Sequence, residues 1–186
     1  MQACATSSGF AKRPRGLASS KYNERRRECE QAVEMLAAKL DIGLLADITA
    51  AEFEEHKHLI RDETVLKRAE HVVYEIKRTK EAVDFLAEDD LAAFGKRMND
   101  SHDSLANLYE VTGFALDTMV AAARKQKGVL GSRMTGAGFG GCTVSLVEDR
   151  HIEAFIEEVG REYEEKTGTS ADFYIAGIGD GAREVS

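Results

Sequence analysis

Four glycines within six positions are the residues of this 186-residue sequence that most clearly suggest chemistry. They lie between Gly136 and Gly141, in the string RMTGAGFGGCTVSLV. Because glycine has no Cβ, such a segment lets another backbone or a phosphate come close to its main chain. The same glycines also suit a plain β-hairpin, in which they supply the positive φ angles of tight turns. Four glycines are more than a hairpin turn requires, which favours a close approach.

Known phosphate-binding motifs are distinguished by what surrounds their glycines. Residues 136–141 match G-x-G-x-x-G formally, but the dinucleotide-binding motif requires a helix next. The following residues, CTVSLV, predict a strand instead. The Walker A motif fails too, because Cys142 stands where its lysine should be, and the catalytic loop of the protein kinases is absent. The glycine loop alone therefore indicates close approach without naming a reaction.

Few other side chains stand out as chemical groups. Tyr22 begins an amphipathic segment, where a phenol either hydrogen-bonds a polar ligand or packs half-buried at a helix start. Arg133, three residues before the glycines, faces either a phosphate or the solvent. His56 and His58 are two positions apart and so point to different helix faces, which argues against a metal pair. We therefore assign no catalytic residue and no metal ligand from these residues.

The composition excludes several classes of protein. A net charge of −8 and a pI of about 5.2 argue against a nucleic-acid partner, because an acidic surface repels phosphate backbones. No window approaches the roughly 18 apolar residues of a membrane span, and the start has no apolar region of a secretory signal. Three cysteines far apart in the sequence indicate reduced thiols. We expect a cytoplasmic protein with one well-buried core, or at most two small ones.

The hydrophobic spacing predicts helices first and strands late. Helices are expected at about 20–40, 49–59, 62–86, 91–108, 114–127 and 149–168, and strands at about 129–136, 142–147 and 171–185. This order is typical of an α+β fold that is mostly helical, with a small antiparallel sheet covered by helices.

Single residues within these elements carry more specific expectations. Ser20 is expected to cap the first helix, and Arg25 to lie largely on its solvent side. Thr49 and Glu52 form a capping box for the second helix. On the third helix Val83 is assigned to the buried face.

The chain divides into two parts by this reasoning. Residues 1–14 carry small polar residues and a basic cluster, and are expected to form a tail or an edge strand. Residues 15–186 are expected to form the folded domain.

Four stretches of the sequence resemble galactokinases, which belong to the GHMP family of small-molecule kinases. The stretches occur in the same order in this chain as in that family. GSRMTGAGFGGCTVSLV (131–147) resembles the third conserved motif of that family. The other three stretches are RGLASSKYNERRRECEQA (15–32), KRAEHVVYEIKRT (67–79) and MNDSHDSLANLYEVT (98–112). The resemblance covers roughly residues 15–186 and implies the fold of a GHMP kinase C-terminal domain.

The resemblance also implies a reaction. Galactokinases move the γ-phosphoryl group of ATP, with Mg²⁺, to the C1 hydroxyl of galactose, which depends on positioning and charge stabilisation. Tyr22 matches the family tyrosine that hydrogen-bonds a sugar hydroxyl. The loop Gly136, Ala137, Gly138, Phe139, Gly140 and Gly141 is expected beside the sugar and phosphates, where it shapes the site. His71 and His102 are expected to be hydrogen-bonded structural residues rather than bases.

Several family features have no counterpart in these 186 residues. The sugar-recognition motif, the Ser-rich phosphate loop and the catalytic Asp and Arg all belong to the N-terminal half of galactokinases. We therefore expect the C-terminal half alone, inactive without its N-terminal half, with an exposed apolar surface that favours self-association. The alternatives are a non-catalytic sugar-sensing regulator, one subunit of a split kinase, or a related kinase for another sugar.

Overall fold

A computed structural model describes residues 2–8 and 15–177 of the chain, as six α-helices, four strands and short 3₁₀ and π segments. The helices are α1 (Arg15–Leu36), α2 (Ala50–His56), α3 (Glu63–Ala87), α4 (Leu91–Ser104), α5 (Phe114–Arg124) and α6 (Ile152–Thr167). The strands are β1 (Gln2–Ser8), β2 (Val129–Thr135), β3 (Cys142–Val147) and β4 (Ala171–Ala176). The short segments are η1 (Leu45–Asp47), η2 (Lys57–Leu59), η3 (Leu105–Tyr109) and η4 (Asp149–His151).

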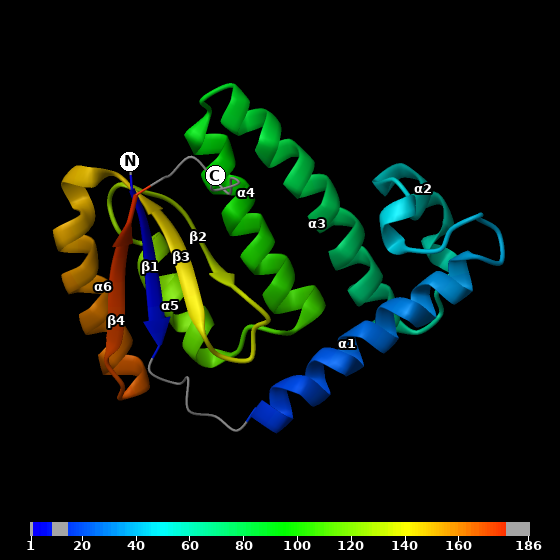
Figure 1. The fold of residues 1–186 in the computed structure, drawn as a ribbon, viewed down its shortest axis with the longest axis horizontal. Coiled ribbons are helices and arrows are strands. Elements are labelled where there is room, and N and C mark those ends of the chain that lie inside the picture. Colours follow the sequence, from blue (N-terminus) through cyan, green and yellow to red (C-terminus); the bar gives the residue numbers. More distant parts are fainter. Residues whose placement is uncertain (1, 9–14, 178–186) are drawn as a thin grey trace, which may run out of the picture.

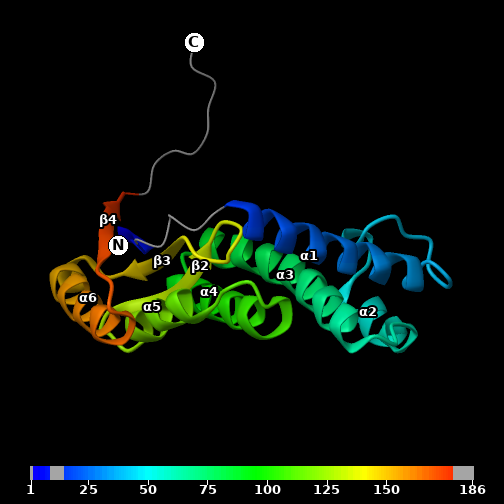
Figure 2. The same cartoon turned by 90° about the horizontal axis from the view of Figure 1, so that it is seen from below.

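The four strands form one sheet in the order β2-β3-β1-β4, and every neighbouring pair is antiparallel. Helices α5 and α6 lie together on one face of this sheet (Figure 2). Phe155, Val159 and Tyr163 of α6 are fully buried there, because α6 places its apolar residues at helical spacing toward the sheet. The predicted α+β fold with a small antiparallel sheet is confirmed.

The N-terminal segment differs from its expectation. Gln2–Ser8 form β1, which pairs with β3 on one side and β4 on the other, so the strand is internal rather than at an edge. Its partners lie about 140 and 170 residues further along the chain, and such long-range pairing leaves no local signal in the sequence. Residues 9–14 and the glycine-rich exit expected at 178–185 lie outside the described residues.

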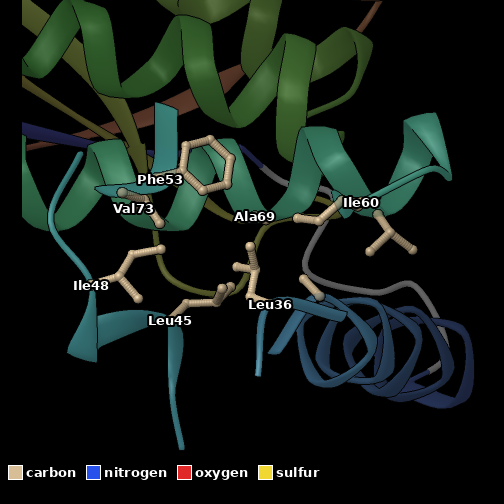
Figure 3. Packing of buried hydrophobic residues seen from close by; sticks show 9 residues of the cluster. Leu36, Leu45, Ile48, Phe53, Ile60, Ala69 and Val73 are labelled. Atoms are coloured by element: carbon tan, nitrogen blue, oxygen red, sulfur yellow. The ribbon is translucent and has the colours of Figure 1, made fainter. Parts of the chain in front are cut away.

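Residues 15–87 form an arm of helices that extends away from the sheet (Figure 1), and we call this part the helical arm. Its own apolar cluster is buried between α1, α2 and α3 and includes Leu36, Leu45, Phe53 and Val73 (Figure 3). The predicted capping box is present, with Thr49 and Glu52 each accepting from the other's backbone N–H. The arm therefore has a small core of its own.

Three expectations for the helical arm are wrong. Helix α1 already begins at Arg15, so Ser20 lies inside it, which agrees with the good helix propensity of Arg, Leu and Ala in this stretch. Val83 is 62 % exposed, because no other element covers the end of α3 at that position. Arg25 is buried rather than exposed to solvent, because its guanidinium binds backbone carbonyl oxygens of residues 109 and 110.

Helix α4 lies directly on strand β2, and two glycines permit this contact. A Cβ on Gly95 would lie 2.4 Å from the carbonyl oxygen of Leu130, and one on Gly131 would lie 2.3 Å from that of Gly95. Since real Cβ atoms do not come this close to backbone atoms, neither position accepts a side chain without a shift. This contact fixes the beginning of α4 against β2. No helix in the described ranges is long and apolar enough to span a membrane.

Candidate functional site

The glycine loop connects β2 to β3 and follows a backbone path that side chains disfavour. Gly136, Gly138, Gly140 and Gly141 have φ angles of 84°, 80°, 111° and 118°. Phe139 is also left-handed, with φ of 60°. Around Gly136 and Gly140 there is open space, since a Cβ at either position would meet no atom within 4 Å. The loop thus presents main chain that another group can approach closely.

One residue of the neighbouring turn holds this loop in place. The N–H of Phe139 donates to the carbonyl oxygen of Val111 at 2.6 Å. Gly138 lies so close that a Cβ there would be 2.2 Å from the same oxygen. The Phe139 side chain packs on an apolar cluster that includes Val111, Leu116 and Met134. The loop is therefore anchored at its centre and open toward its two ends.

The turn that carries Val111 has unusual geometry. Helix α4 passes into the π-helix η3, which ends at Glu110 in the left-handed conformation with φ of 54°. The sequence predicts one continuous helix here, because helical spacing does not distinguish an α-helix from a π-helix. A π-helix is rare and is found mostly at functional sites.

Two buried arginines bind the carbonyl oxygens at the end of η3. Arg25 of α1 donates through Nε to Tyr109 O at 2.6 Å and through Nη2 to Glu110 O at 3.4 Å. Arg68 of α3 donates to Leu108 O. Their exposed fractions are 5 % and 2 %. The carbonyls that the helix leaves unpaired are thus satisfied by side chains of the helical arm.

Three glutamates complete the charge balance of these arginines, and the first, Glu24, has its Oε1 at 3.2 Å from Arg25 Nη1. Glu28 Oε2 lies 2.8 Å from Arg25 Nη1 and 3.0 Å from Arg68 Nε. Glu110 Oε2 lies 2.6 Å from Arg68 Nη2, and this hydrogen bond lowers the pKa of the Glu110 carboxyl. Buried guanidinium groups are stable only when paired and hydrogen-bonded in this way. We call Arg25, Glu28, Arg68 and Glu110 the arginine junction.

The arginine junction brings together the four sequence stretches that resemble one family. Arg25 and Glu28 come from the first, Arg68 from the second, and Glu110 and Val111 from the third. Through Val111 the third holds the glycine loop of the fourth. Sequence reasoning missed this junction, although Arg68 lies three residues after Val65 and four before Val72, on the apolar face of its helix, which was the available signal.

Tyr22 lies on α1, one turn before Arg25, and is 60 % exposed. It lines a cavity of about 580 Å³ together with Leu44, Val72 and Tyr109. Phe139 and Gly140 line a different cavity of about 320 Å³, with the turn from Glu110 to Ala115. The structure does not bring Tyr22 and the glycine loop into one cavity. Tyr109 lines the first cavity, and the next residue, Glu110, lines the second.

The two histidines of the matching stretches are hydrogen-bonded inside the protein. His71 Nδ1 lies 2.8 Å from Ser104 Oγ, and its ring stacks on Tyr109 at 4.4 Å. His102 Nδ1 accepts the N–H of Met134 at 3.2 Å. Burial lowers the pKa of His71 to about 4 and also lowers the pKa of His102. Both rings are neutral at neutral pH and connect α3 and α4 to their neighbours.

Arg133 lies on β2, three residues before the glycine loop. The Arg133 guanidinium lies 3.5 Å from a carboxylate oxygen of Glu75, so it faces an ion partner on α3.

Within residues 2–8 and 15–177 no group of three or more His, Cys, Asp or Glu side chains could hold a metal ion.

Comparisons with known proteins agree with this geometry. Residues 82–165 match the family model of the GHMP kinases C terminal. A galactokinase of Fusobacterium nucleatum is 59 % identical over 172 residues, which are 92 % of this chain and 44 % of that protein. A galactokinase of Clostridium acetobutylicum is 54 % identical over the same shares of both proteins. The chain thus spans less than half the length of these relatives.

Solved structures extend the comparison to three dimensions. The crystal structure of Lactococcus lactis galactokinase complexed with galactose superposes with a TM-score of 0.90 at 45 % identity, over 99 % of this chain and 47 % of that one. The mevalonate kinase of L. major, with a TM-score of 0.59 at 16 % identity, shares the fold alone. The chain therefore belongs to the GHMP kinase family, represented by its C-terminal domain, and corresponds to the C-terminal part of galactokinases.

Proposed function

We propose that this chain supplies the C-terminal wall of a galactokinase active site, in which ATP phosphorylates galactose at its C1 hydroxyl. The observation that carries the proposal is the glycine loop, anchored at Val111 and open around Gly136 and Gly140. The identity of 50 to 59 % to eight galactokinases over nine-tenths of the chain supports it.

The role of the loop in this reaction is steric and positional. The oxygen of the sugar C1 hydroxyl forms a bond to the γ-phosphorus while the bond from that phosphorus to the bridging oxygen of ADP breaks. Such a transfer depends on holding the two reactants in line. Without side chains at Gly136 and Gly140, the phosphates and the other half of the enzyme can lie against the main chain. The proton of the hydroxyl passes to the catalytic Asp of the other half.

Tyr22 is proposed to bind the sugar. Its phenol is exposed on α1 and offers one donor and one acceptor on a rigid ring, which suits the edge of a sugar. Arg25, one turn away, ties this part of α1 to Tyr109 and Glu110 and so to the turn beside the glycine loop. The sugar at Tyr22 would then lie close to the turn that anchors the glycine loop.

ATP and Mg²⁺ are proposed as the other components. Mg²⁺ would be bound together with the phosphates of ATP. When bound, Mg²⁺ neutralises charge on the phosphates. The proposed partners of the chain are the N-terminal half, galactose and ATP, in the cytoplasm. Exposed apolar side chains such as Leu44, Phe114 and Tyr174 make self-association of the isolated chain part of the same proposal.

Complementation tests the function directly. The chain is co-expressed with the N-terminal part of the Fusobacterium nucleatum galactokinase, and ADP release is followed in a coupled assay with galactose. The pair is expected to turn over and the 186-residue chain alone is not, because the family's catalytic Asp and phosphate loop lie in the other part. In the active pair, Tyr22→Phe should raise the KM for galactose about tenfold, the effect of one lost hydrogen bond.

A second exposed tyrosine provides the control. Tyr174 on β4 is 58 % exposed, close to the 60 % of Tyr22, and Tyr174→Phe should leave the KM unchanged. Steady turnover by the purified chain alone would refute the divided active site. A pair that associates without galactose-dependent ADP release would favour the regulatory alternative.

A further inference from the structure

We infer that Arg25 and Arg68 are positioning residues for the glycine loop, which act by fixing the turn at residues 108–111. The inference rests on the proposed function, in which the loop lies beside the phosphates. Neither arginine touches the loop itself: each binds carbonyl oxygens of residues 108–110, and the next residue, Val111, binds the loop.

The turn needs this support because its own backbone cannot stabilise it. The last carbonyls of a helix have no partner within the helix. In addition, Glu110 is a non-glycine residue in the left-handed conformation, which is unfavourable for a residue with a Cβ. Two backbone bonds close the turn from inside, and both go to Leu105 O: one from the N–H of Glu110 and one, at 3.1 Å, from the N–H of Val111. External donors are therefore required to hold the remaining carbonyls in one direction.

Arginine is suited to this task by its shape. The planar guanidinium presents five N–H donors in a fixed fork, whereas a lysine presents a single mobile ammonium. Arg68 uses three of its nitrogens on three different partners, namely Glu28, Leu108 O and Glu110. Arg25 likewise binds both a carboxylate and two carbonyls. Each side chain thus fixes the distance between its own helix and the turn.

Val111 transmits the position of the turn to the loop. The 2.6 Å bond from Phe139 N–H to Val111 O joins the centre of the loop to the residue after Glu110. Gly138 allows the two backbones to touch, because a side chain there would collide with that oxygen. If residues 108–110 lose their fixed direction, Val111 O moves and this bond weakens. The loop then becomes mobile although no residue in it has changed.

Amide hydrogen exchange of the 186-residue chain, followed by NMR, tests this coupling. In Arg25→Lys and in Glu110→Ala, the exchange of the Phe139 amide should become about tenfold faster. The exchange of Val159, buried in α6 away from the junction, should not change. The control is Arg26→Lys, since Arg26 is adjacent on α1 but exposed, with a single bond to Glu30, and it should alter neither amide.

The outcomes separate positioning from a general loss of stability. Unchanged Phe139 exchange in both variants would overturn the inference, and so would equal acceleration of Phe139 and Val159. Should Arg25→Lys fail to fold, Glu110→Ala decides, because the Glu110 side chain is half-exposed and its removal leaves no buried cavity. The measurement uses neither sugar nor nucleotide. A failure of the complementation assay therefore leaves this result valid, and the reverse also holds.

Discussion

Two regions of this protein are equally buried for opposite reasons. Phe155, Val159 and Tyr163 on α6 are buried because their apolar surfaces leave water when they pack against the sheet. Arg25 and Arg68 are buried because each of their guanidinium nitrogens donates to a carboxylate or a carbonyl oxygen. Burial alone therefore does not identify a region as a hydrophobic core.

The difference between the two regions concerns direction. Apolar contact is non-directional, so the core under the sheet stabilises the fold with little demand on any one angle. Charge-assisted hydrogen bonds have fixed geometry, and breaking one leaves a buried charge. The main role of the arginine junction is therefore to specify where the turn at 108–111 lies, rather than to add stability. The predictions below test this division of roles.

The largest effect is expected in the apolar core. Phe155→Ala should lower the free energy of unfolding by about 4 kcal/mol, since it removes a fully buried ring and leaves a cavity. Urea denaturation measures the change. Phe114→Ala is the matched control, because Phe114 is 68 % exposed and its loss should cost less than about 0.5 kcal/mol. Similar losses for the two variants would contradict the assignment of this core.

The second effect concerns how stability depends on pH, through the buried neutral histidines of α3 and α4. Burial lowers the pKa of His71 to about 4, so the unfolded chain binds its proton first as the pH falls below about 6.5. Stability should therefore decrease as the pH falls, by about 2 kcal/mol between pH 8 and pH 5. His102 contributes in the same direction, because burial also lowers its pKa. Denaturation curves across this range measure the loss.

A substitution isolates the contribution of His71. His71→Asn can keep a hydrogen bond to Ser104 but cannot titrate, so its stability should depend less steeply on pH. His58→Asn, at an exposed position, should leave the slope as it is. An identical slope in the protein and in His71→Asn would show that the buried ring does not control the acid response.

The smallest effect distinguishes two glycines of the loop. Gly138→Ala and Gly136→Ala both place a side chain at nearly the same φ, 80° and 84°. Gly138→Ala should nevertheless cost about 1 kcal/mol more, because the added Cβ collides with Val111 O and displaces the bond to Phe139. Denaturation midpoints of the two variants give the difference. Equal costs would mean that contact with Val111 does not hold the loop.

Much of the fold could be predicted because its signals are local. The capping box at Thr49 and Glu52, the apolar stripe of α6 and the strands on both sides of the glycine loop each depend on neighbouring residues. The internal position of β1 could not be predicted, because it depends on pairing with strands more than 130 residues away. The burial of Arg25 was missed for the same reason, since its carbonyl partners come from residues 109 and 110.

In the candidate site, too, local features could be predicted from the sequence and long-range contacts could not. The number and spacing of its glycines, together with the four matching stretches, identified the loop and the family from the sequence. The sequence did not indicate that Val111 holds this loop, that η3 is a π-helix, or that Tyr22 and the loop line separate cavities.

The sequence by itself determined most of the helices and strands, because periodicity and glycine conformation are properties of short segments, and the four matching stretches determined the family. Only the tertiary structure decided how the four stretches meet. That arrangement depends on charged groups from α1 and α3 reaching carbonyl oxygens of the turn after α4, and such pairing exists only once the helices are packed.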